Sequence, residues 1–403
     1  MEFDSTWFLI GLPLAFALGW LASRFDLRQW RLENRQAPKA YFKGLNYLLN
    51  EQQDQAIDAF IEAVQRDPDT SELHFALGNL FRRRGEYERA VRVHEHLLSR
   101  ADLPAADRER AQYALALDFL KAGLLDRAED ALLKLQDTHY AQQAALTLLS
   151  IYERGREWTK AGGIARQLQA QGQGDFSGRL AHYLCEQADA AQRQKEAGDA
   201  PIPVPVPGTG PQAARQLLDE AIRQAPDAAR PRIQLAGWFV AQGDPARAFE
   251  TLLQLPEHAP QCLPLVDSEL VRLGVACGKV DQALAALESH AQTSGAQAPS
   301  IDVTDAIVQA LAAQGVPSDQ ARQRYLQHMA QEPSLIAAAR WLAHEIFTHE
   351  ADHPTVQRTL DHATRPLARY RCAACGFEAR GYFWQCPGCQ AWESFPPRRI
   401  EEL

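Results

Sequence analysis

Four cysteines close to the C-terminal end of the sequence have the spacing of a metal site. Cys372 and Cys375 form one C-x2-C pair, ten residues follow, and Cys386 and Cys389 form a second pair. Two such turns can bring four thiolates to the corners of a tetrahedron around one metal ion. The spacing therefore predicts a single tetrahedral four-cysteine centre with these side chains as its ligands.

The predicted centre is structural and not catalytic. Four thiolates complete a tetrahedral coordination shell, so no position is left for a water molecule to be activated. A short segment with few apolar groups needs such a staple to fold, and we expect aromatic side chains to cover it and arginines to offset its negative charge. The aromatic residues of the segment are Phe377, Tyr382, Phe383, Trp384, Trp392 and Phe395, and the arginines are Arg371, Arg380, Arg398 and Arg399.

The two cysteine turns resemble those of rubredoxins, which hold a single iron ion, and they also suit a zinc ribbon. Gln390 stands where a glycine usually follows the second turn, and the ten-residue gap is shorter than in electron-carrying rubredoxins. Iron and zinc both accept tetrahedral sulfur. We therefore expect one iron ion, with zinc as the alternative that the spacing leaves open.

A second pattern of metal-binding residue types does not support catalysis. The stretch HEADH at residues 349–353 matches the H-E-x-x-H motif of zinc proteases. Pro354 follows at once and disfavours helical geometry at His353, so the two imidazoles would not share one helix face. The sequence also contains no nucleophile elbow and no kinase motif. We predict that the chain is not an enzyme.

The elements that precede the cysteines repeat with a period of 34 residues. Gly44, Tyr47, Ala56, Phe60, Ala63 and Pro68 have counterparts 34 residues later in Gly78, Phe81, Ala90, His94, Leu97 and Asp102. This is the period of the tetratricopeptide repeat, a pair of antiparallel helices that cross closely where a small residue faces a large one. Further units centre on Ala128, Ala161, Ala214, Ala248, Ala283 and Ala321, which makes about eight repeats.

Helix pairs of this kind cover each other's apolar faces and stack into a continuous solenoid. We therefore predict an all-α fold, a superhelical tetratricopeptide solenoid over residues 37–366, followed by a small rubredoxin-like or zinc-ribbon knuckle domain over residues 367–403. The Pro-rich insert 199–211 interrupts the solenoid and is expected to be an extended loop between two helices of one repeat.

Tetratricopeptide arrays line their concave surface with the first helix of each pair. The resemblance places seven residues of this chain on such a surface, and it implies a groove for an extended or helical peptide with acidic character. Phe75 occupies a position where the chaperone-type clamp for a terminal carboxylate requires charge. The candidate partner-binding residues are Tyr41, Phe75, Asn79, Arg82, Arg83, Tyr113 and Lys121.

The first segment of the sequence predicts a membrane anchor. Residues 5–23 carry no charge over nineteen positions, which is enough for a helix to cross the hydrocarbon core once. Basic residues follow this stretch and acidic residues precede it, so the large C-terminal part is expected in the cytoplasm. We assign residues 1–23 to the anchor and 24–36 to a basic juxtamembrane linker. A net charge of −9 argues against nucleic acid as a partner.

An anchor, a tetratricopeptide solenoid and a terminal four-cysteine domain, in this order, resemble the lipopolysaccharide assembly protein B family of Gram-negative bacteria. The stretches CAACGF and WQCPGCQAW, which begin at Cys372 and Trp384, make the resemblance specific. It implies a single-pass protein of the bacterial inner membrane with a short periplasmic N-terminus and a cytoplasmic bulk.

The family resemblance further implies an adaptor without catalysis of its own. Such an adaptor works with the membrane AAA+ protease FtsH to promote degradation of the deacetylase that commits precursors to lipid A, and it gathers other lipopolysaccharide assembly proteins. Two alternatives stay open: a rubredoxin-like electron carrier, and a general tetratricopeptide scaffold for other membrane complexes.

Overall fold

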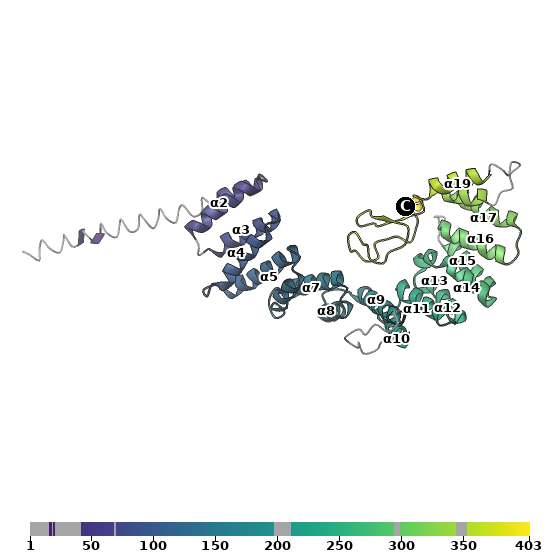
Figure 1. The fold of residues 1–403 in the computed structure, drawn as a ribbon, viewed down its shortest axis with the longest axis horizontal. Coiled ribbons are helices and arrows are strands. Elements are labelled where there is room, and N and C mark those ends of the chain that lie inside the picture. Colours follow the sequence, from purple (N-terminus) through teal and green to yellow (C-terminus); the bar gives the residue numbers. More distant parts are fainter. Residues whose placement is uncertain are drawn as a thin grey trace, which may run out of the picture. The chain divides into compact units, whose positions relative to one another are not determined.

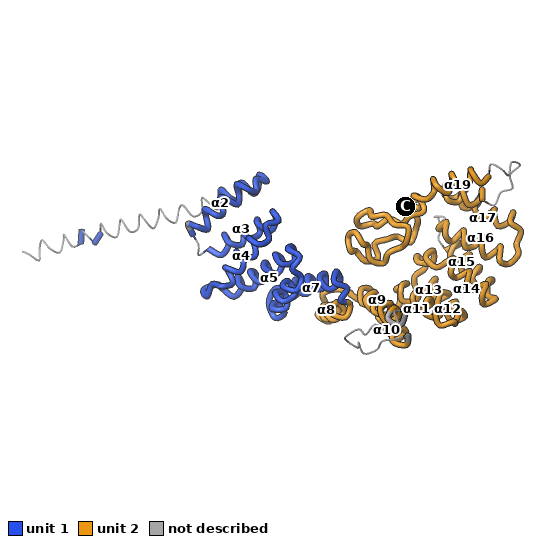
Figure 2. The backbone as a smooth tube through the Cα atoms, in the orientation of Figure 1, with its two compact units in different colours: residues 1–157 blue, residues 158–403 orange. Residues whose placement is uncertain are grey.

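The computed structural model describes residues 16–17, 19–20, 42–67, 70–196, 211–293, 299–343 and 353–403. The chain divides into two compact units, residues 1–157 and 158–403 (Figure 2). Residues 42–49 are helical, and the helices that follow in the first unit are α2 (Gln53–Arg66), α3 (Ser71–Arg84), α4 (Tyr87–Ser99), α5 (Ala105–Lys121), α6 (Leu125–Leu133) and α7 (Ala141–Gly155) (Figure 1).

The second unit contains more helices and a small two-stranded sheet. Its helices before the Pro-rich insert are α8 (Trp158–Ala170) and α9 (Ser177–Glu196). After the insert come α10 (Pro211–Gln224), α11 (Ala229–Ala241), α12 (Pro245–Leu253), α13 (Leu255–His258), η1 (Pro260–Leu265), α14 (Asp267–Cys277), α15 (Val280–Thr293), α16 (Ile301–Ala313), α17 (Ser318–Gln331), α18 (Leu335–Ala343) and α19 (His353–Thr364). Strands β1 (Tyr370–Arg371) and β2 (Glu378–Ala379) and the short helix η2 (Ile400–Glu402) complete it.

The helices pack as the 34-residue period predicts. A Cβ atom added to Gly44 would lie 2.8 Å from the ring of Phe60, and one added to Gly78 would lie 2.5 Å from the ring of His94. The same small-against-large contact thus recurs one repeat later, with His94 in place of Phe60. Glycine permits this approach because it has no side chain to separate the two helices.

Left-handed residues separate the two helices of several repeats. Gly85 has φ 84°, and its amide and that of Glu86 close α3 on the carbonyl oxygens of Arg82 and Phe81. Arg156 adopts the same conformation after α7, with φ 56°. A side chain at this position is strained because its Cβ crowds the backbone. The end of α7 therefore departs from the pattern in sequence, with arginine in place of glycine, and keeps the left-handed backbone.

The small residues predicted to centre the repeats are all buried: Ala128, Ala161, Ala214, Ala248, Ala283 and Ala321. In the second unit an extended apolar core runs from α9 to α16. Helices α9 and α10 pack on each other within this core, although the Pro-rich insert separates them in the sequence. Apart from Pro211, the insert lies outside the described residues.

The knuckle domain follows α19 (Figure 1), and its small apolar core packs against Leu265 of η1. Strands β1 and β2 pair antiparallel, with Tyr370 opposite Ala379 and Arg371 opposite Glu378. The predicted anchor at 5–23 falls almost wholly outside the described residues, as does linker 24–36. Among the residues that the structure does describe, none of the helices combines the length and apolar character that crossing a membrane requires.

Candidate metal centre and binding surfaces

The four sulfur atoms of the knuckle domain lie at the corners of a small tetrahedron. Cys372 Sγ and Cys389 Sγ are 3.8 Å apart, Cys375 Sγ and Cys386 Sγ are 3.7 Å apart, and all four lie within 4.8 Å of one another. A metal–sulfur bond of about 2.3 Å gives a tetrahedral edge of about 3.8 Å, whereas a disulfide bond is about 2.05 Å long. The four cysteines are therefore positioned for one tetrahedral metal ion.

Two matching turns of backbone hold these sulfurs. The amide of Gly376 donates to the carbonyl oxygen of Cys372, and the amide of Gln390 donates to that of Cys386, each at 2.9 Å. Gly376 has φ 76° and Gln390 has φ 62°. Gln390 thus takes the left-handed conformation that a glycine usually supplies, so the second turn keeps its geometry with an unfavourable residue.

Polar groups around Cys372 favour its thiolate. Burial of the sulfur acts to raise its pKa, but the contact with the Ser394 hydroxyl and hydrogen bonds with the backbone amides of Cys375 and Ala374 lower the pKa to about 6 overall. Ser394 Oγ lies 3.2 Å from the sulfur. Metal sites require deprotonated cysteines, and the surroundings of Cys372 favour that form at one of the four positions.

The four ligands differ in exposure. Cys372 and Cys386 are buried, whereas Cys375 and Cys389 face solvent. Among the aromatic residues predicted to cover the cluster, Phe395 is 1% exposed, but Phe377 and Phe383 are 41% and 40% exposed. Four sulfurs leave no coordination position for water, so the arrangement fits a structural ion with two sulfurs at the surface.

Two of the arginines predicted to offset the charge of the centre have other partners. Arg371 forms an ion pair with Glu378 at 2.9 Å, and Arg399 forms one with Asp302 of α16 at 2.7 Å. The guanidinium of Arg399 also lies 4.3 Å from the ring centre of Tyr370. Arg399 therefore joins the knuckle domain to the solenoid.

The knuckle domain docks on α9 through His182. The rings of His182 and Trp392 are stacked with centroids 4.7 Å apart, and His182 Nε2 lies 3.0 Å from Glu393 Oε1. Arg230 Nη1, which can only donate, lies 3.5 Å from His182 Nδ1. Nδ1 therefore accepts and Nε2 donates its hydrogen to Glu393, which lowers the pKa of that carboxyl group.

The end of the knuckle domain also caps two solenoid helices. Glu402 accepts hydrogen bonds from the amide of Ile301 at 2.5 Å and from the hydroxyl of Ser300 at 3.1 Å. Glu401 accepts from the amide of Ile336 at 3.2 Å and from the hydroxyl of Ser334 at 2.8 Å. Carboxylates at helix N-termini satisfy otherwise unpaired amides. The knuckle domain is thus part of the packing of α16 and α18.

The predicted groove residues of the first unit have different environments. Tyr41 lies outside the described residues, and Phe75 is buried with the guanidinium of Arg110 4.1 Å from its ring centre. Arg83 and Lys121 are both exposed. Tyr113 stacks on Tyr140 at 5.2 Å. Phe75 therefore packs in the core, whereas Arg83 and Lys121 offer positive charge at the surface.

Arg82 and Asn79 belong to a network that the sequence analysis did not predict. Arg82 Nη1 donates to Asp118 at 2.8 Å, and Arg82 Nη2 donates to Asn79 at 2.5 Å. The second oxygen of Asp118 lies 2.5 Å from His94 Nδ1, and both His94 and Asp118 are fully buried. His94 and Asp118 lie on different helices, so the repeat pattern does not pair them. The one signal in the sequence is that a histidine, His94, stands where the preceding repeat has Phe60.

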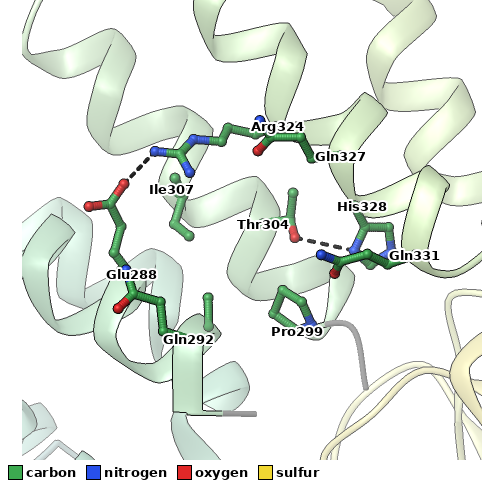
Figure 3. A pocket seen from close by; sticks show the side chains of 10 residues that line it. Glu288, Gln292, Pro299, Thr304, Ile307, Arg324, Gln327, His328 and Gln331 are labelled. Atoms are coloured by element: carbon green, nitrogen blue, oxygen red, sulfur yellow. Dashed lines mark hydrogen bonds and ion pairs between the residues drawn. The ribbon is translucent and has the colours of Figure 1, made fainter. Parts of the chain in front are cut away.

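A cavity of about 470 Å³ lies among α15, α16 and α17 (Figure 3). On one side Arg324 donates to Glu288, and on the other Thr304 Oγ1 lies 3.4 Å from His328 Nδ1. The amide side chains that line it are those of Gln292, Gln327 and Gln331. Its arginine and glutamate are paired with each other, so the cavity is a polar hollow without net charge, which the sequence analysis did not predict.

The HEADH stretch adds nothing to these sites. Residues 349–352 lie outside the described part of the chain. His353 is the first residue of α19, and its Nε2 lies 3.4 Å from the carbonyl oxygen of Leu342.

Helix pairs with a 34-residue period and a four-cysteine knuckle define a tetratricopeptide-repeat protein with a C-terminal rubredoxin-type metal-binding domain. Residues 370–397 match the family described as rubredoxin metal binding domain, and residues 73–109 and 211–272 match tetratricopeptide repeat families. The chain belongs to the lipopolysaccharide assembly protein B family.

Family membership rests on relatives that align from end to end. The protein named lipopolysaccharide assembly protein B of Escherichia coli K12 is 31% identical over 96% of this chain and 97% of its own. The protein of the same name from Haemophilus influenzae Rd is 26% identical over 97% of this chain and 98% of its own. A solved tetratricopeptide repeat protein from Parabacteroides merdae is 12% identical, covers 69% of this chain and 99% of its own, and gives a TM-score of 0.32.

Proposed function

We propose that the chain is an inner-membrane adaptor that regulates lipopolysaccharide synthesis and performs no catalysis itself. The observation that carries this proposal is the end-to-end match to relatives named lipopolysaccharide assembly protein B. Tetratricopeptide solenoids present binding surfaces and not closed reaction sites, which agrees with an adaptor.

The contacts between the knuckle domain and the solenoid support the same role. Glu401 and Glu402 cap α18 and α16, and Glu393 meets His182 of α9. The metal site therefore stabilises the arrangement of several solenoid helices at once. In this proposal Cys372, Cys375, Cys386 and Cys389 hold one ion, iron in the first place and zinc as the alternative, as a structural element of a binding surface.

The proposed partners follow from the family resemblance. The client is the deacetylase that commits precursors to lipid A, the protease is FtsH, and other lipopolysaccharide assembly proteins are gathered beside them. Residues 5–23 would anchor the chain in the inner membrane with its bulk in the cytoplasm, and such confinement raises its effective concentration toward membrane-bound partners. Arg83 and Lys121 lie at the surface and suit an acidic segment of a client.

The experiment that tests the adaptor role measures the half-life of the deacetylase in cells. Cys372→Ser removes one ligand, so we expect loss of the metal and a deacetylase that is degraded several-fold more slowly. Cys277→Ser, which changes a half-buried cysteine outside the knuckle domain, is the matched control and should leave turnover unchanged. Unchanged turnover in Cys372→Ser, with the metal demonstrably lost, would contradict the adaptor role of the knuckle domain.

A second candidate function is electron transfer by the metal centre. It is favoured by one observation, the exposure of Cys375 and Cys389, which would bring a redox partner close to the ion. Iron at about one ion per chain, with a colour that bleaches and returns on reduction and reoxidation, would support this candidate. Bound zinc would exclude it, because zinc has no accessible redox step.

A further inference from the structure

A cavity of about 330 Å³ lies where the knuckle domain meets the solenoid. Asp227 and Cys262 line it from the solenoid, and Trp384, Glu393 and Ser394 line it from the knuckle domain. A pocket of this size accepts a single long side chain or a small molecule. Its walls come from residues far apart in the sequence, so it exists only when the two parts are packed together.

Two carboxylates stand on opposite sides of this junction. The side chain of Asp227, in the turn between α10 and α11, is 87% exposed, and that of Glu393 is 56% exposed, so both can be reached from solvent. Glu393 Oε1 accepts a hydrogen bond from His182, whose other nitrogen faces Arg230. The second oxygen of Glu393 has no hydrogen-bond partner in the described part of the chain. Glu393 is thus held in place with one oxygen available.

The remaining walls favour a flat cation. Tyr382 and Trp384 line the cavity, and their rings meet edge to face with centroids 5.0 Å apart. Of the described residues that line the cavity, none is basic. Outside the lining, His258 Nδ1 lies 3.7 Å from Asp227, and Arg232 donates to two backbone carbonyl oxygens of the turn before α11. The two carboxylates therefore lack a counter-charge from the cavity itself.

We propose that this cavity binds the guanidinium group of an arginine side chain presented by a partner protein. A guanidinium can donate to both carboxylates through separate N–H groups and lay its face on an aromatic ring. A lysine ammonium is compact and strongly hydrated, so it matches two separated acceptors and aromatic walls less well. Hydrogen bonds between charged groups are about twice as strong as neutral ones, which makes the charge of the side chain the main determinant.

The test uses the full-length, metal-loaded chain and the fluorescently labelled pentapeptide Ser-Gly-Arg-Gly-Ser. Two further peptides carry lysine or the uncharged isostere citrulline in place of arginine. We expect the arginine peptide to bind about tenfold more tightly than the citrulline peptide, with the lysine peptide between them. Equal binding of the arginine and citrulline peptides, or no measurable binding of either, would overturn the proposal.

Variants then locate the site. Asp227→Asn and Glu393→Gln should each weaken binding of the arginine peptide several-fold and leave the citrulline peptide unaffected. Glu250→Gln, on exposed α12 surface away from the cavity lining, is the control. Glu393→Gln also alters the contact with His182, so its metal content and thermal unfolding are measured alongside, and Asp227→Asn gives an independent answer from an exposed position. Unchanged affinity in Asp227→Asn would place the peptide elsewhere and refute the assignment.

Arginine binding in this cavity does not depend on which client the adaptor recruits. The peptide assay contains neither the protease nor the deacetylase, so its failure overturns the arginine site alone. Unchanged deacetylase turnover in Cys372→Ser overturns the adaptor role and leaves the arginine site standing.

Discussion

Gly78 of α3 lies directly against the imidazole of His94 of α4. A Cβ atom on Gly78 would stand 2.5 Å from Cε1 and 2.6 Å from Nε2 of that ring, closer than real side chains approach each other. The ring cannot simply turn away, because its Nδ1 lies 2.5 Å from the buried carboxylate of Asp118. Helix spacing and the polar network of the first unit are therefore linked through one glycine.

This contact predicts a large cost for Gly78→Ala. The added methyl group must push α3 and α4 apart or break the bond between His94 and Asp118, so we expect a loss of about 2–3 kcal/mol in stability. Gly237→Ala is the control, since a Cβ at Gly237 meets nothing within 4 Å and should stabilise α11 by about 0.5–1 kcal/mol. Thermal unfolding measures the stability of both variants. Equal melting temperatures for Gly78→Ala and Gly237→Ala would contradict the close contact between Gly78 and His94.

Gln390 predicts a substitution that strengthens the metal centre. Its φ of 62° disfavours a side chain by about 1–2 kcal/mol, so Gln390→Gly should stabilise the second cysteine turn by up to about 1 kcal/mol after the extra chain entropy of glycine is counted. Release of the metal to a chelator should become a few-fold slower. Ala374 has no positive φ, so the control variant Ala374→Gly should release the metal faster than the wild type. Faster release from Gln390→Gly would show that the backbone at Gln390 is not strained.

Asp267 predicts a pH dependence of stability. Burial raises the pKa of this carboxyl group to about 7, and repulsion from Asp302 and Asp305 acts in the same direction. The folded chain therefore keeps a proton that the unfolded chain releases above about pH 4, so stability from this group falls as the pH rises from about 4 to about 7.

Asp267→Asn removes this loss because an amide cannot ionise. The variant should be more stable than the wild type at pH 8, by roughly a few kcal/mol, and the difference should shrink toward pH 4. Melting temperatures between pH 4 and pH 8 measure it. The control Asp319→Asn changes a side chain that is 82% exposed, so its melting temperatures should follow those of the wild type. If Asp267→Asn also follows the wild type at every pH, the carboxyl group of Asp267 titrates normally and the prediction is wrong.

Loss of the metal should be felt at the distant ends of α16 and α18. Cys386→Ser removes a fully buried ligand and should free the tail that carries Glu401 and Glu402. We expect hydrogen exchange of the Ile301 and Ile336 amides to accelerate by about tenfold or more, because both lose their acceptor. Cys277→Ser should leave both rates unchanged. Unaltered exchange in metal-free Cys386→Ser would show that the caps form without the ion.

Much of the fold could be predicted because its signals are local. Gly44 meets Phe60 within one helix pair, and Gly78 meets His94 within the next. Each central alanine is likewise buried by neighbours that are close in the sequence. The arrangement of the four sulfurs likewise follows from turns of four residues. Periodicity and spacing record such neighbours directly.

The docking of the knuckle domain could not be predicted because it joins residues that are distant in sequence. His182 and Glu393 are separated by 211 positions, and nothing in either stretch marks the pair. The groove prediction placed Phe75 by its position in the repeat, whereas the guanidinium of Arg110, which lies over that buried ring, comes from the next repeat. Long-range contacts of this kind leave no period in the sequence.

The cap on α16 has a consequence for the order of biosynthesis. Glu402 follows Ile301 by 101 residues, so the ribosome has extruded the whole of α16 to α19 before the carboxylate that completes α16 appears. During this interval the N-terminus of α16 must rely on Ser300 alone, whose hydroxyl faces the amide of Asp302. The N-termini of α16 and α18 therefore receive their last hydrogen-bond acceptors only after translation has passed the four cysteines.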